Sequence, residues 1–558
     1  MTRTLLASTV EQPQAISRRR WPALLGLALA SEALYALLVL MLKPFPGLGL
    51  VPTPLLALPA WNGLHLPLSR FDAIGLLLLF LLALTACYGL AARLILNGEP
   101  FRSSGLTLGL VLGASSLFGL TLLCLPTLFT DTVFASWLSG RLIALYGLAP
   151  WHTVPPALPA DPYWSWLTPL TRHSPLVYGP LWEWLCALLA LLPATSSPTL
   201  GLLLLKGLLL LAHLLNTLLI WALLGRLETV PGHRFAGSLL YAWNPLALLA
   251  LAGDGHSEGL LLTLLLATLW WLLLGEQPRS SRGTALLSEA AALVTLGLAI
   301  ALSPLALPLW PLLVGFSLWQ RARRADAWSW GGRLWAWGWR LLLPAGVVLV
   351  LALPLWRGAG SYLALMAASG WTSFARSPLA LLVPPLRWLY TPLAVLLDSP
   401  RHRQPSQPAE LTVKGTALFC SALLFIWLMV RMRSWLRARS ECPPGDLSAT
   451  TALSSLISGW LLALGIWLLL LSFNFWPWYV LPVVGLATLR RPDAVSRSAL
   501  VFSLTALLSC ALLGISSALG LALVGLLIFA PPLVYLTGAF FGLWRGRRAT
   551  FKEAQTSA

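Results

Sequence analysis

The sequence predicts an all-α, polytopic integral membrane protein with about 14 transmembrane helices. Of its 558 residues, 58% are hydrophobic and only 10% are charged, whereas about a quarter of the residues in soluble domains are charged. Many apolar runs of roughly 17 to 25 residues follow one another, and each is long enough to cross a hydrocarbon core about 30 Å thick. The 37 Lys and Arg residues lie in short clusters between these runs. Such clusters indicate topology rather than nucleic-acid binding, because basic loops stay on the cytoplasmic side.

The first three spans are predicted near Trp21 to Leu42, Phe71 to Leu96 and Leu106 to Phe129. The run Arg18 to Arg20 precedes the first span, and no convincing cleavage site follows. We therefore expect an uncleaved first span with a cytoplasmic N-terminus. Three crossings then place residues 130–178 outside, as the first large external loop.

The side on which each Arg cluster lies decides which apolar runs cross, since every crossing inverts the side. The run Leu181 to Leu192 has only about a dozen residues and suits a re-entrant or interfacial helix. If it crossed, the Arg residues between positions 321 and 340 would lie outside. We therefore predict that it does not cross. Six spans follow, near residues 200–224, 235–252, 258–275, 285–302, 304–319 and 341–356.

The same reasoning applies to the last third of the chain. The Pro-interrupted stretch Ser377 to Leu397 must not cross, because otherwise Arg431 and Arg433 would be external. Residues 357–413 then form a second external region, in which Ser399 to Glu410 is at most a flexible loop. The remaining spans lie near residues 415–430, 450–472, a short one after Trp478, 498–516 and 518–543, so both termini are cytoplasmic.

Asp131 lies where the third span emerges, ahead of Arg141 in the first external loop. An acid at the mouth of a membrane helix is costly and usually has a purpose. Asp131 could serve as a general base for a hydroxyl nucleophile. It could equally mark a helix end at the interface, or cap a surface helix.

A second motif ends the same loop, where Tyr178 and Trp182 lie among Gly and Pro residues. Such aromatic residues can form a rigid wall for a sugar ring, and they can equally belong to an interfacial aromatic belt. Arg172 and His173 lie just before them. This pair could bind phosphate or simply face lipid headgroups.

The third motif runs from Asn244-Pro245 to Glu258. Pro245 weakens its span, and such breaks are tolerated where the backbone lines a polar cavity. At helical spacing Asp254 and Glu258 share one face, with His256 turned away from both. A metal site needs at least three converging ligands, so no resident metal or cofactor is predicted and a divalent cation stays an open alternative. A plain polar loop is the other interpretation.

The fourth motif, Trp476 with Trp478 and Tyr479, opens a short span and is typical of an interfacial anchor. Lys206 stands alone in an apolar run, with His213 about two turns further on. A buried ammonium needs a partner, which could be the phosphate of a lipid substrate or a carboxylate of the chain. Under the predicted topology the four motifs all lie on the external face.

In this order the motifs resemble those of the membrane-embedded glycosyltransferases of the C superfamily (GT-C), especially the bacterial polyprenol-phosphate-mannose-dependent α-mannosyltransferases. The resemblance covers roughly residues 105–490 and includes the Tyr178-Gly179-Pro180-Leu181-Trp182 string, the Asn244-Pro245 to His256 block and the Pro477-Trp478-Tyr479 segment. It implies a GT-C-like catalytic core at 105–490. Residues 1–104 then add a tail and two helices, and residues 491–558 add the last helices and a basic tail.

The resemblance implies a cell-membrane enzyme that transfers a hexose, with mannose favoured, from a polyprenyl-phosphate carrier to a glycan or glycolipid hydroxyl on the outer face. Asp131 would deprotonate the acceptor during an inverting in-line attack. Candidates for meeting the phosphate charge are Arg141, Arg172, His173 and Lys206. Candidates for holding the sugar or lipid are Tyr178, Trp182, Trp476 and Trp478, and the other candidate substrate-binding residues are Asn244, Asp254, His256, Glu258 and Tyr479.

Two other classes of membrane protein share this layout. A lipid-linked glycan flippase or transporter would also have broken helices and polar residues near mid-membrane, although no internal repeat is visible in the sequence. A ligase that joins lipid-linked glycans is the third interpretation of the sequence. In each case the expected partners are a lipid-linked glycan, its acceptor and membrane lipids, without nucleic acid.

Overall fold

A computed structural model describes most of the chain. The described residues are 12–41, 70–97, 101, 104–152, 161, 163–164, 167, 169–173, 175–192, 198–227, 232–275, 281–324, 330–368, 377–396, 406–440, 449–513 and 518–556. Every regular element in these ranges is a helix. The predicted all-α fold class is therefore confirmed.

Ten helices in the described ranges are long and apolar enough to cross a membrane. They are α1 (Gln12–Met41), α2 (Arg70–Leu96), α3 (Gly105–Leu123), α7 (Pro198–Arg226), α10 (Glu258–Gly275), α11 (Arg282–Leu302), α13 (Trp330–Ala352), α16 (Ser406–Ser440), α17 (Ala449–Ile466) and α20 (Ala518–Thr556). A bent segment adds an eleventh span if it is counted as one. It consists of α8 (His233–Ala242), α9 (Pro245–Leu248) and the π-helix η4 (Leu249–Gly253), with a 45° bend. The protein is thus a multi-pass membrane protein.

The predicted total of about 14 spans also included three shorter segments. They are α12 (Leu309–Arg324), the 3₁₀ turn η10 (Pro477–Val480) continued by α18 (Leu481–Thr488), and α19 (Ala494–Cys510). Each has fewer than 18 residues. The total of 14 stays a prediction.

Two helices are longer than the apolar pattern indicates. α1 begins at Gln12, so it includes the three arginines that precede the first apolar run. α16 begins at Ser406, so the prediction of a loop from Ser399 to Glu410 is wrong for residues 406–410. Residues 399–405 lie outside the described ranges. In both cases a helix continues through polar residues, which an apolar window does not detect.

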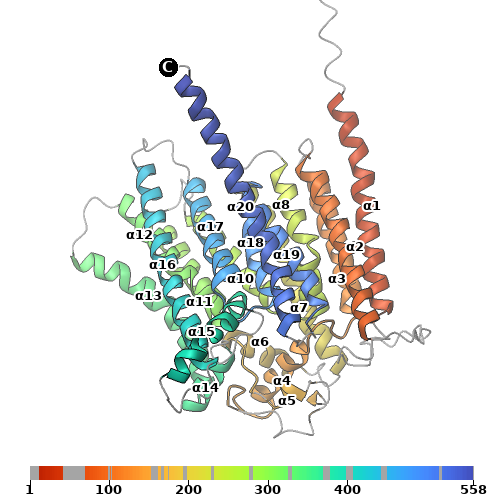
Figure 1. Ribbon diagram of the computed structural model, residues 1–558, viewed down its shortest axis with the longest axis vertical. Helices are drawn as coiled ribbons and strands as arrows, with labels where there is room; N and C mark the ends of the chain where they lie inside the picture. Colours follow the sequence, from red (N-terminus) through yellow and green to blue (C-terminus); the bar gives the residue numbers. More distant parts are fainter. Residues whose placement is uncertain are drawn as a thin grey trace, which may run out of the picture.

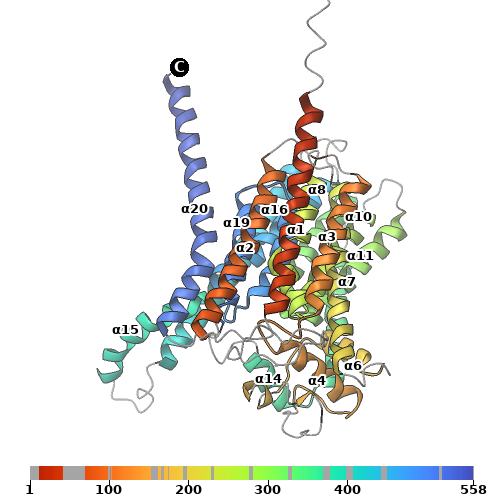
Figure 2. The ribbon, with the colours of Figure 1, turned by 90° about the vertical axis from the view of Figure 1, so that its right-hand side faces the viewer.

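The two ends of the helix bundle differ in what they carry (Figures 1 and 2). The start of α1 and the end of α20 lie at the same end, here called the terminal end. Short helices gather at the opposite end, here called the loop end: α4 (Thr132–Ala144), α5 (Pro169–Arg172), α6 (Pro180–Ala190), α14 (Ala359–Ala368) and α15 (Val383–Leu396). With 11 residues, α6 is only about 16 Å long and too short to cross a bilayer. The arrangement agrees with two large loop regions on the side away from the termini.

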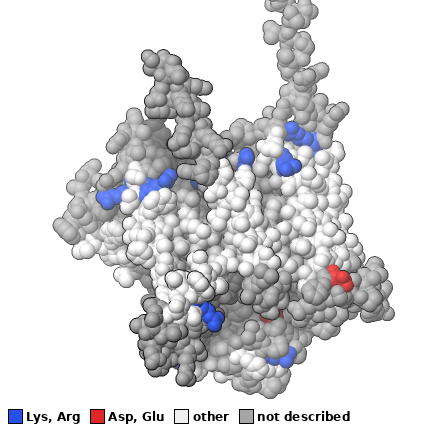
Figure 3. Space-filling model, viewed as in Figure 1, with Lys and Arg blue, Asp and Glu red and all other residues white. Residues whose placement is uncertain are grey.

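Charged and apolar surface residues are also distributed unequally between the terminal end and the loop end. On the face shown in Figure 3, Lys and Arg side chains gather mainly towards the terminal end, and the middle zone is uncharged. Large apolar side chains such as Leu29, Leu342 and Val350 are exposed on the outer faces of the spans. Lipid rather than water suits such a surface, and the basic residues mark the end expected to face the cytoplasm.

Candidate functional site

The break in the bent span is built by Asn244 and Pro245. Asn244 is the N-cap of α9, where its Oδ1 accepts from the backbone N–H groups of Leu246 at 3.1 Å and Ala247 at 3.3 Å. Its Nδ2 donates to Ser503 Oγ at 2.9 Å. The side chain is fully buried, and these bonds give it a structural role. Asn244 therefore shapes the segment that delivers Asp254.

Asp254 is the centre of a dense hydrogen-bond network at the end of this segment. Its Oδ1 accepts from Thr127 Oγ1 at 2.7 Å and from the N–H groups of Leu128 and Phe129 at 2.6 and 2.7 Å. Its Oδ2 accepts from Thr130 Oγ1 at 3.1 Å. The fully buried carboxylate thus ties the turn after α3 to the start of α10.

His256 supplies the fifth donor to Asp254. Its Nε2 lies 3.0 Å from Asp254 Oδ2, and it donates because an ionised carboxylate only accepts. Burial alone raises the pKa of Asp254, but the bonds from His256, Phe129 and Thr127 outweigh it and hold that pKa below its ordinary value. Asp254 is therefore a charged anchor.

The prediction that His256 turns away from Asp254 is wrong. Gly255 has a φ of 80°, a left-handed conformation that interrupts helical spacing. Residues 254–257 consequently form a turn, and α10 starts only at Glu258. The turn folds His256 back onto Asp254, whereas helical geometry would have separated them.

A stack of three rings continues from His256. The imidazole lies on Trp478 with ring centroids 3.5 Å apart and planes 17° apart. Trp478 in turn stacks on Trp476 at 5.0 Å and 15°. Glu258 and Tyr479 are close enough to interact electrostatically. Thus the third and fourth motifs, more than 200 residues apart in sequence, meet at one place.

Asp131 follows the anchored turn directly. It occupies the N-cap position of α4, and its backbone carbonyl accepts from the N–H groups of Phe134 and Ala135, both at 3.0 Å. Its side chain makes no capping hydrogen bond and is half-buried. Because Thr130 is bonded to Asp254, the network fixes where Asp131 enters the loop end.

Helix α6 packs on α4 at backbone contact. A Cβ on Gly140 would lie 2.3 Å from the carbonyl carbon of Cys186, so only glycine fits between the two helices. Trp182 Nε1 donates to Ser136 Oγ at 3.0 Å. The aromatic residue Trp182 is fully buried in this contact, so it holds the two helices together.

Glu183 is a buried acid that the sequence interpretation missed. Its Oε1 accepts from the Tyr178 N–H at 3.1 Å, and its Oε2 accepts from Ser139 Oγ. Burial raises the pKa of Glu183 to about 8, although hydrogen bonds from Tyr178 and Trp151 partly oppose the shift. The available signal was a lone acid inside the short apolar run 181–192.

Tyr178 lies between Glu183 in α6 and Asp131 at the start of α4. Its hydroxyl is 3.5 Å from the Thr132 carbonyl, and Asp131 is near enough to contribute to a raised Tyr178 pKa, of which burial is the larger cause. Its carbonyl accepts from Trp151 Nε1 at 3.2 Å. Tyr178 therefore lies beside the start of α4, next to Asp131.

The predicted phosphate-binding cations have different surroundings. Arg141 Nε donates to Asp161 Oδ2 at 2.9 Å, and its guanidinium lies 5.2 Å from the centre of the Tyr163 ring. Arg172 lies over Trp164 at 5.6 Å, and His173 is exposed. Asp161 thus supplies the counter-charge of Arg141 within the loop end.

Lys206 is fully buried in α7 and has partners of two kinds. Its Nζ donates to the carbonyl groups of Leu122 and Leu125 at the end of α3. Asp254 is near enough to interact with it electrostatically. His213 belongs to another network, since its Nε2 lies 2.9 Å from Ser115 Oγ. The structure therefore brings Lys206, but not His213, towards Asp254.

Metal binding has no support from the described residues, among which no three His, Cys, Asp or Glu side chains gather as ligands. Asp254 and His256 already bond to each other, and Asp254 Oδ1 accepts three hydrogen bonds. These contacts engage the lone pairs that a cation would need.

Residues 47–319 match the family model described as alpha-(1->6)-mannopyranosyltransferase, N-terminal domain. This region belongs to that mannosyltransferase family. The match contains every element of the site except the Trp476–Tyr479 segment, and it makes the chain a membrane glycosyltransferase. No curated protein and no solved structure matches the chain.

Proposed function

We propose that this mannosyltransferase moves a mannosyl residue from a polyprenyl-phosphate carrier to a glycan or glycolipid hydroxyl at the loop end, on the outer face of the membrane. The family match supports the sugar and the reaction class. The chain has no extended soluble domain within its described residues, so a donor anchored in the membrane suits it.

The observation that carries the proposal is the convergence at Asp254 of the 127–131 turn, the 254–258 turn and the rings of Trp478 and Trp476. An acid and a flat aromatic platform are groups that suit a transferring sugar. Here the turn that leads to Asp131 and the rings of Trp478 and Trp476 come from distant parts of the chain, and both are joined to the Asp254–His256 pair.

Asp131 is the base in this proposal. Its carboxylate takes the acceptor hydroxyl proton while the acceptor oxygen attacks the anomeric carbon. The bond from the anomeric carbon to the phosphate oxygen breaks on the opposite side, and polyprenyl phosphate leaves with the electron pair, so the configuration inverts. Asp254 is unsuited to this role because five donors occupy its carboxylate.

The other predicted residues bind and orient substrate in the same proposal. Arg172 and His173 meet the charge of the leaving phosphate, and Arg141 supports the loop through Asp161. Trp476, which is partly buried and stacks on Trp478, contacts the sugar or the prenyl chain.

The test is mannosyl transfer by the purified full chain from radiolabelled polyprenyl-phosphate-mannose to an acceptor glycolipid. Asp131→Asn should lower turnover by about 10² to 10⁴-fold, the usual contribution of a general base. Glu410→Gln is the matched control, because Glu410 is partly exposed and pairs with Lys414 one turn further along α16. Undiminished transfer by Asp131→Asn would remove Asp131 from this role, and movement of intact carrier without transfer would favour a flippase.

A further inference from the structure

Helix α15 presents large apolar side chains on its outer face. Trp388 is 80% exposed and Leu389 is 60% exposed. The 3₁₀ helix η7 (Pro378–Leu382) leads into α15, and its Leu382 is also exposed. With 14 residues, α15 is about 21 Å long and too short to cross a bilayer. An exposed apolar face of this kind indicates a surface that meets a partner outside the chain.

The opposite face of α15 packs on the bundle. The Tyr390 hydroxyl lies 2.9 Å from Thr412 Oγ1 on α16. Five apolar residues pack together beside this bond: Leu379, Val383, Leu386, Val413 and Ala417. The helix is thus fixed along one side and bare along the other.

Two neighbouring spans, both of which begin at the loop end, give the depth of α15 (Figures 1 and 2). Thr412 comes four residues after Pro408, the first residue of the apolar span in α16, which is about 6 Å along the helix. Leu381 of η7 lies against Gly525, where an added Cβ would be 3.5 Å from it. Gly525 comes five residues after Gly520, the first residue of the apolar span in α20, or about 8 Å. Interfacial helices lie at about this depth, roughly 5–10 Å into the headgroup and acyl boundary.

The charged residues at this level also mark the boundary between headgroups and hydrocarbon. Glu410 and Lys414 form an ion pair at 3.7 Å, one on each side of Thr412 along α16. Arg387 is the one charged residue of α15. It is exposed, and no ion pair among the described residues includes it. A Trp next to an Arg is typical of a membrane interface, where the ring lies at headgroup level and the cation meets a phosphate.

We propose that α15 rests in the boundary of the leaflet at the loop end, where phospholipids cover Trp388 and Leu389 and a lipid phosphate binds Arg387. Lipid is favoured over a protein partner because Leu411 and Phe419 of α16 are also exposed, at the level of α15 and deeper in the same span. The apolar face of α15 therefore adjoins a surface that the bilayer already covers. This proposal does not depend on the mannosyl-transfer reaction.

The membrane-facing helix is joined to the segment that carries Trp476. Ser377, the N-cap of η7, donates from its hydroxyl to the Ser472 carbonyl. Phe473 packs against the same apolar residues as α15. Lipid contact at α15 therefore restrains the chain just before Trp476.

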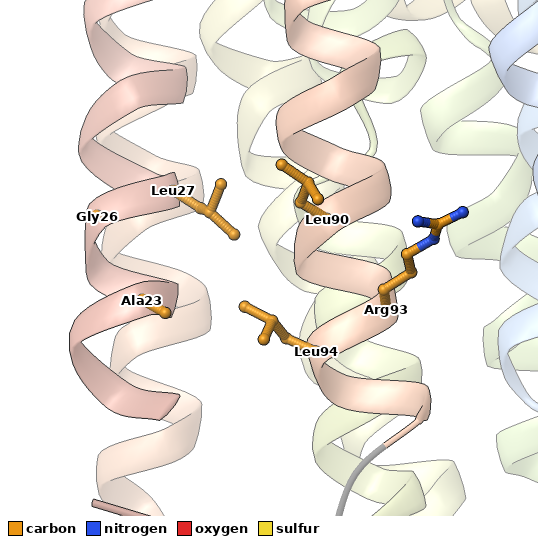
Figure 4. A pocket seen from close by; sticks show the side chains of 6 residues that line it. All are labelled: Ala23, Gly26, Leu27, Leu90, Arg93 and Leu94. Carbon is orange, nitrogen blue, oxygen red and sulfur yellow. The ribbon is translucent and has the colours of Figure 1, made fainter. Parts of the chain in front are cut away.

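The groove between α1 and α2 is a different kind of exposed apolar surface (Figure 4). It is lined by Ala23, Gly26, Leu27, Leu90, Arg93 and Leu94. In Figure 4 the apolar side chains line the space between the two helices, whereas Arg93 projects to the side of α2 away from α1. The groove thus offers a hydrocarbon surface without an aromatic ring among its lining residues, and it does not mark a headgroup position as α15 does.

The test is photo-crosslinking of the full chain in liposomes of equal amounts of phosphatidylcholine and phosphatidylglycerol. Benzoylphenylalanine, a photoreactive amino acid, replaces Trp388 or Leu389, and mass spectrometry of the digested protein identifies the captured molecule. Both positions should give at least about tenfold more phospholipid adduct than the same replacement of Leu145, because a side chain in water meets no lipid. Leu145 is the matched control, since it is apolar, 50% exposed and the C-cap of α4 at the loop end.

A second variant tests the contact with phosphate. Arg387→Gln should lower the ratio of phosphatidylglycerol to phosphatidylcholine in the adduct at position 388 about fivefold, the effect of one cation at an anionic membrane surface. An unchanged ratio overturns the binding of lipid phosphate by Arg387.

The crosslinked species decides between the occupants of the face. Phospholipid adducts at positions 388 and 389 that are scarce at position 145 support the proposal. A polypeptide adduct overturns it and assigns the face to a second copy of the chain. Equal phospholipid yields at all three positions, or no lipid adduct at any, also overturn it, because α15 would then not differ from α4 in its contact with the bilayer.

Discussion

Asp254 and Glu183 are both fully buried, yet their surroundings favour opposite protonation states. Asp254 accepts from five donors, and its pKa is lowered. Glu183 accepts from the Tyr178 N–H and Ser139 Oγ, and its pKa is raised to about 8. Burial raises the pKa of both acids, but the hydrogen bond and electrostatic interaction from His256, with the bonds from Phe129 and Thr127, lower that of Asp254, and Glu183 has no such charged partner among the causes of its shift.

The two acids accordingly hold the loop end in different ways. Charged Asp254 ties the 127–130 turn to α10, with Lys206 nearby. Glu183, neutral at pH 7, joins α6 to α4 without a buried charge. Both positions border Asp131, one through Thr130 and the other through Tyr178.

The largest expected effect comes from removing the charged anchor. Asp254→Ala should destabilise the protein by at least about 3 kcal/mol, because several buried donors lose their acceptor at once. The measurement is the thermal unfolding midpoint of the purified chain in detergent. Glu410→Ala, at a partly exposed local ion pair, should change the midpoint little, and an equally small change for Asp254→Ala would contradict the anchor role.

Substitutions of Glu183 should lower the free energy of unfolding less than Asp254→Ala does, and the loss should depend on which residue replaces the glutamate. Glu183→Ala should cost about 2 kcal/mol at pH 7, since it leaves the Tyr178 N–H and Ser139 Oγ without an acceptor. Glu183→Gln should cost under about 1 kcal/mol, because glutamine resembles the neutral acid in shape and still accepts. Equal unfolding midpoints for the two variants would show that these bonds contribute nothing.

The pH dependence of stability should separate the two acids. Between about pH 4.5, the ordinary value for Glu, and about pH 8, unfolding releases a proton from Glu183. Stability should therefore fall as pH rises through this window, by up to about 1.4 kcal/mol per pH unit, and level off above it. Glu183→Gln should lack this slope, whereas an unchanged slope in the variant would assign it elsewhere.

Asp254 should give the opposite slope at acid pH. Its folded pKa lies below its ordinary value of 3.8, so unfolding takes up a proton there. Its contribution to stability is present above pH 3.8 and is lost as pH falls through the folded pKa. Unfolding midpoints of the wild type and Asp254→Asn should converge on acidification, and divergence would contradict a lowered pKa.

The smallest effect is expected for Tyr178→Phe. The Tyr178 hydroxyl is 3.5 Å from the Thr132 carbonyl, at the limit of a hydrogen bond, so its loss should cost under about 0.5 kcal/mol. Mannosyl transfer should change less than about threefold, since the ring and the backbone bonds to Glu183 remain. A much larger fall in transfer with unchanged stability would show that the hydroxyl contacts substrate.

Sequence patterns predicted the membrane class and most spans because hydrocarbon thickness fixes the length of an apolar run. They failed where a single backbone angle decides the geometry, as at Gly255, whose positive φ turns His256 onto Asp254. They also failed for pairings between distant segments. Asp161 as the partner of Arg141, and the donors to Glu183, depend on tertiary contacts that periodicity does not encode.

The position of Lys206 has a consequence for biogenesis. The ammonium group in α7 rests on the carbonyl groups of Leu122 and Leu125, which are translated before it. Asp254 is translated almost 50 residues after Lys206. The partners that hold the Lys206 ammonium by hydrogen bonds are therefore available in the nascent chain before Asp254, with which it interacts electrostatically.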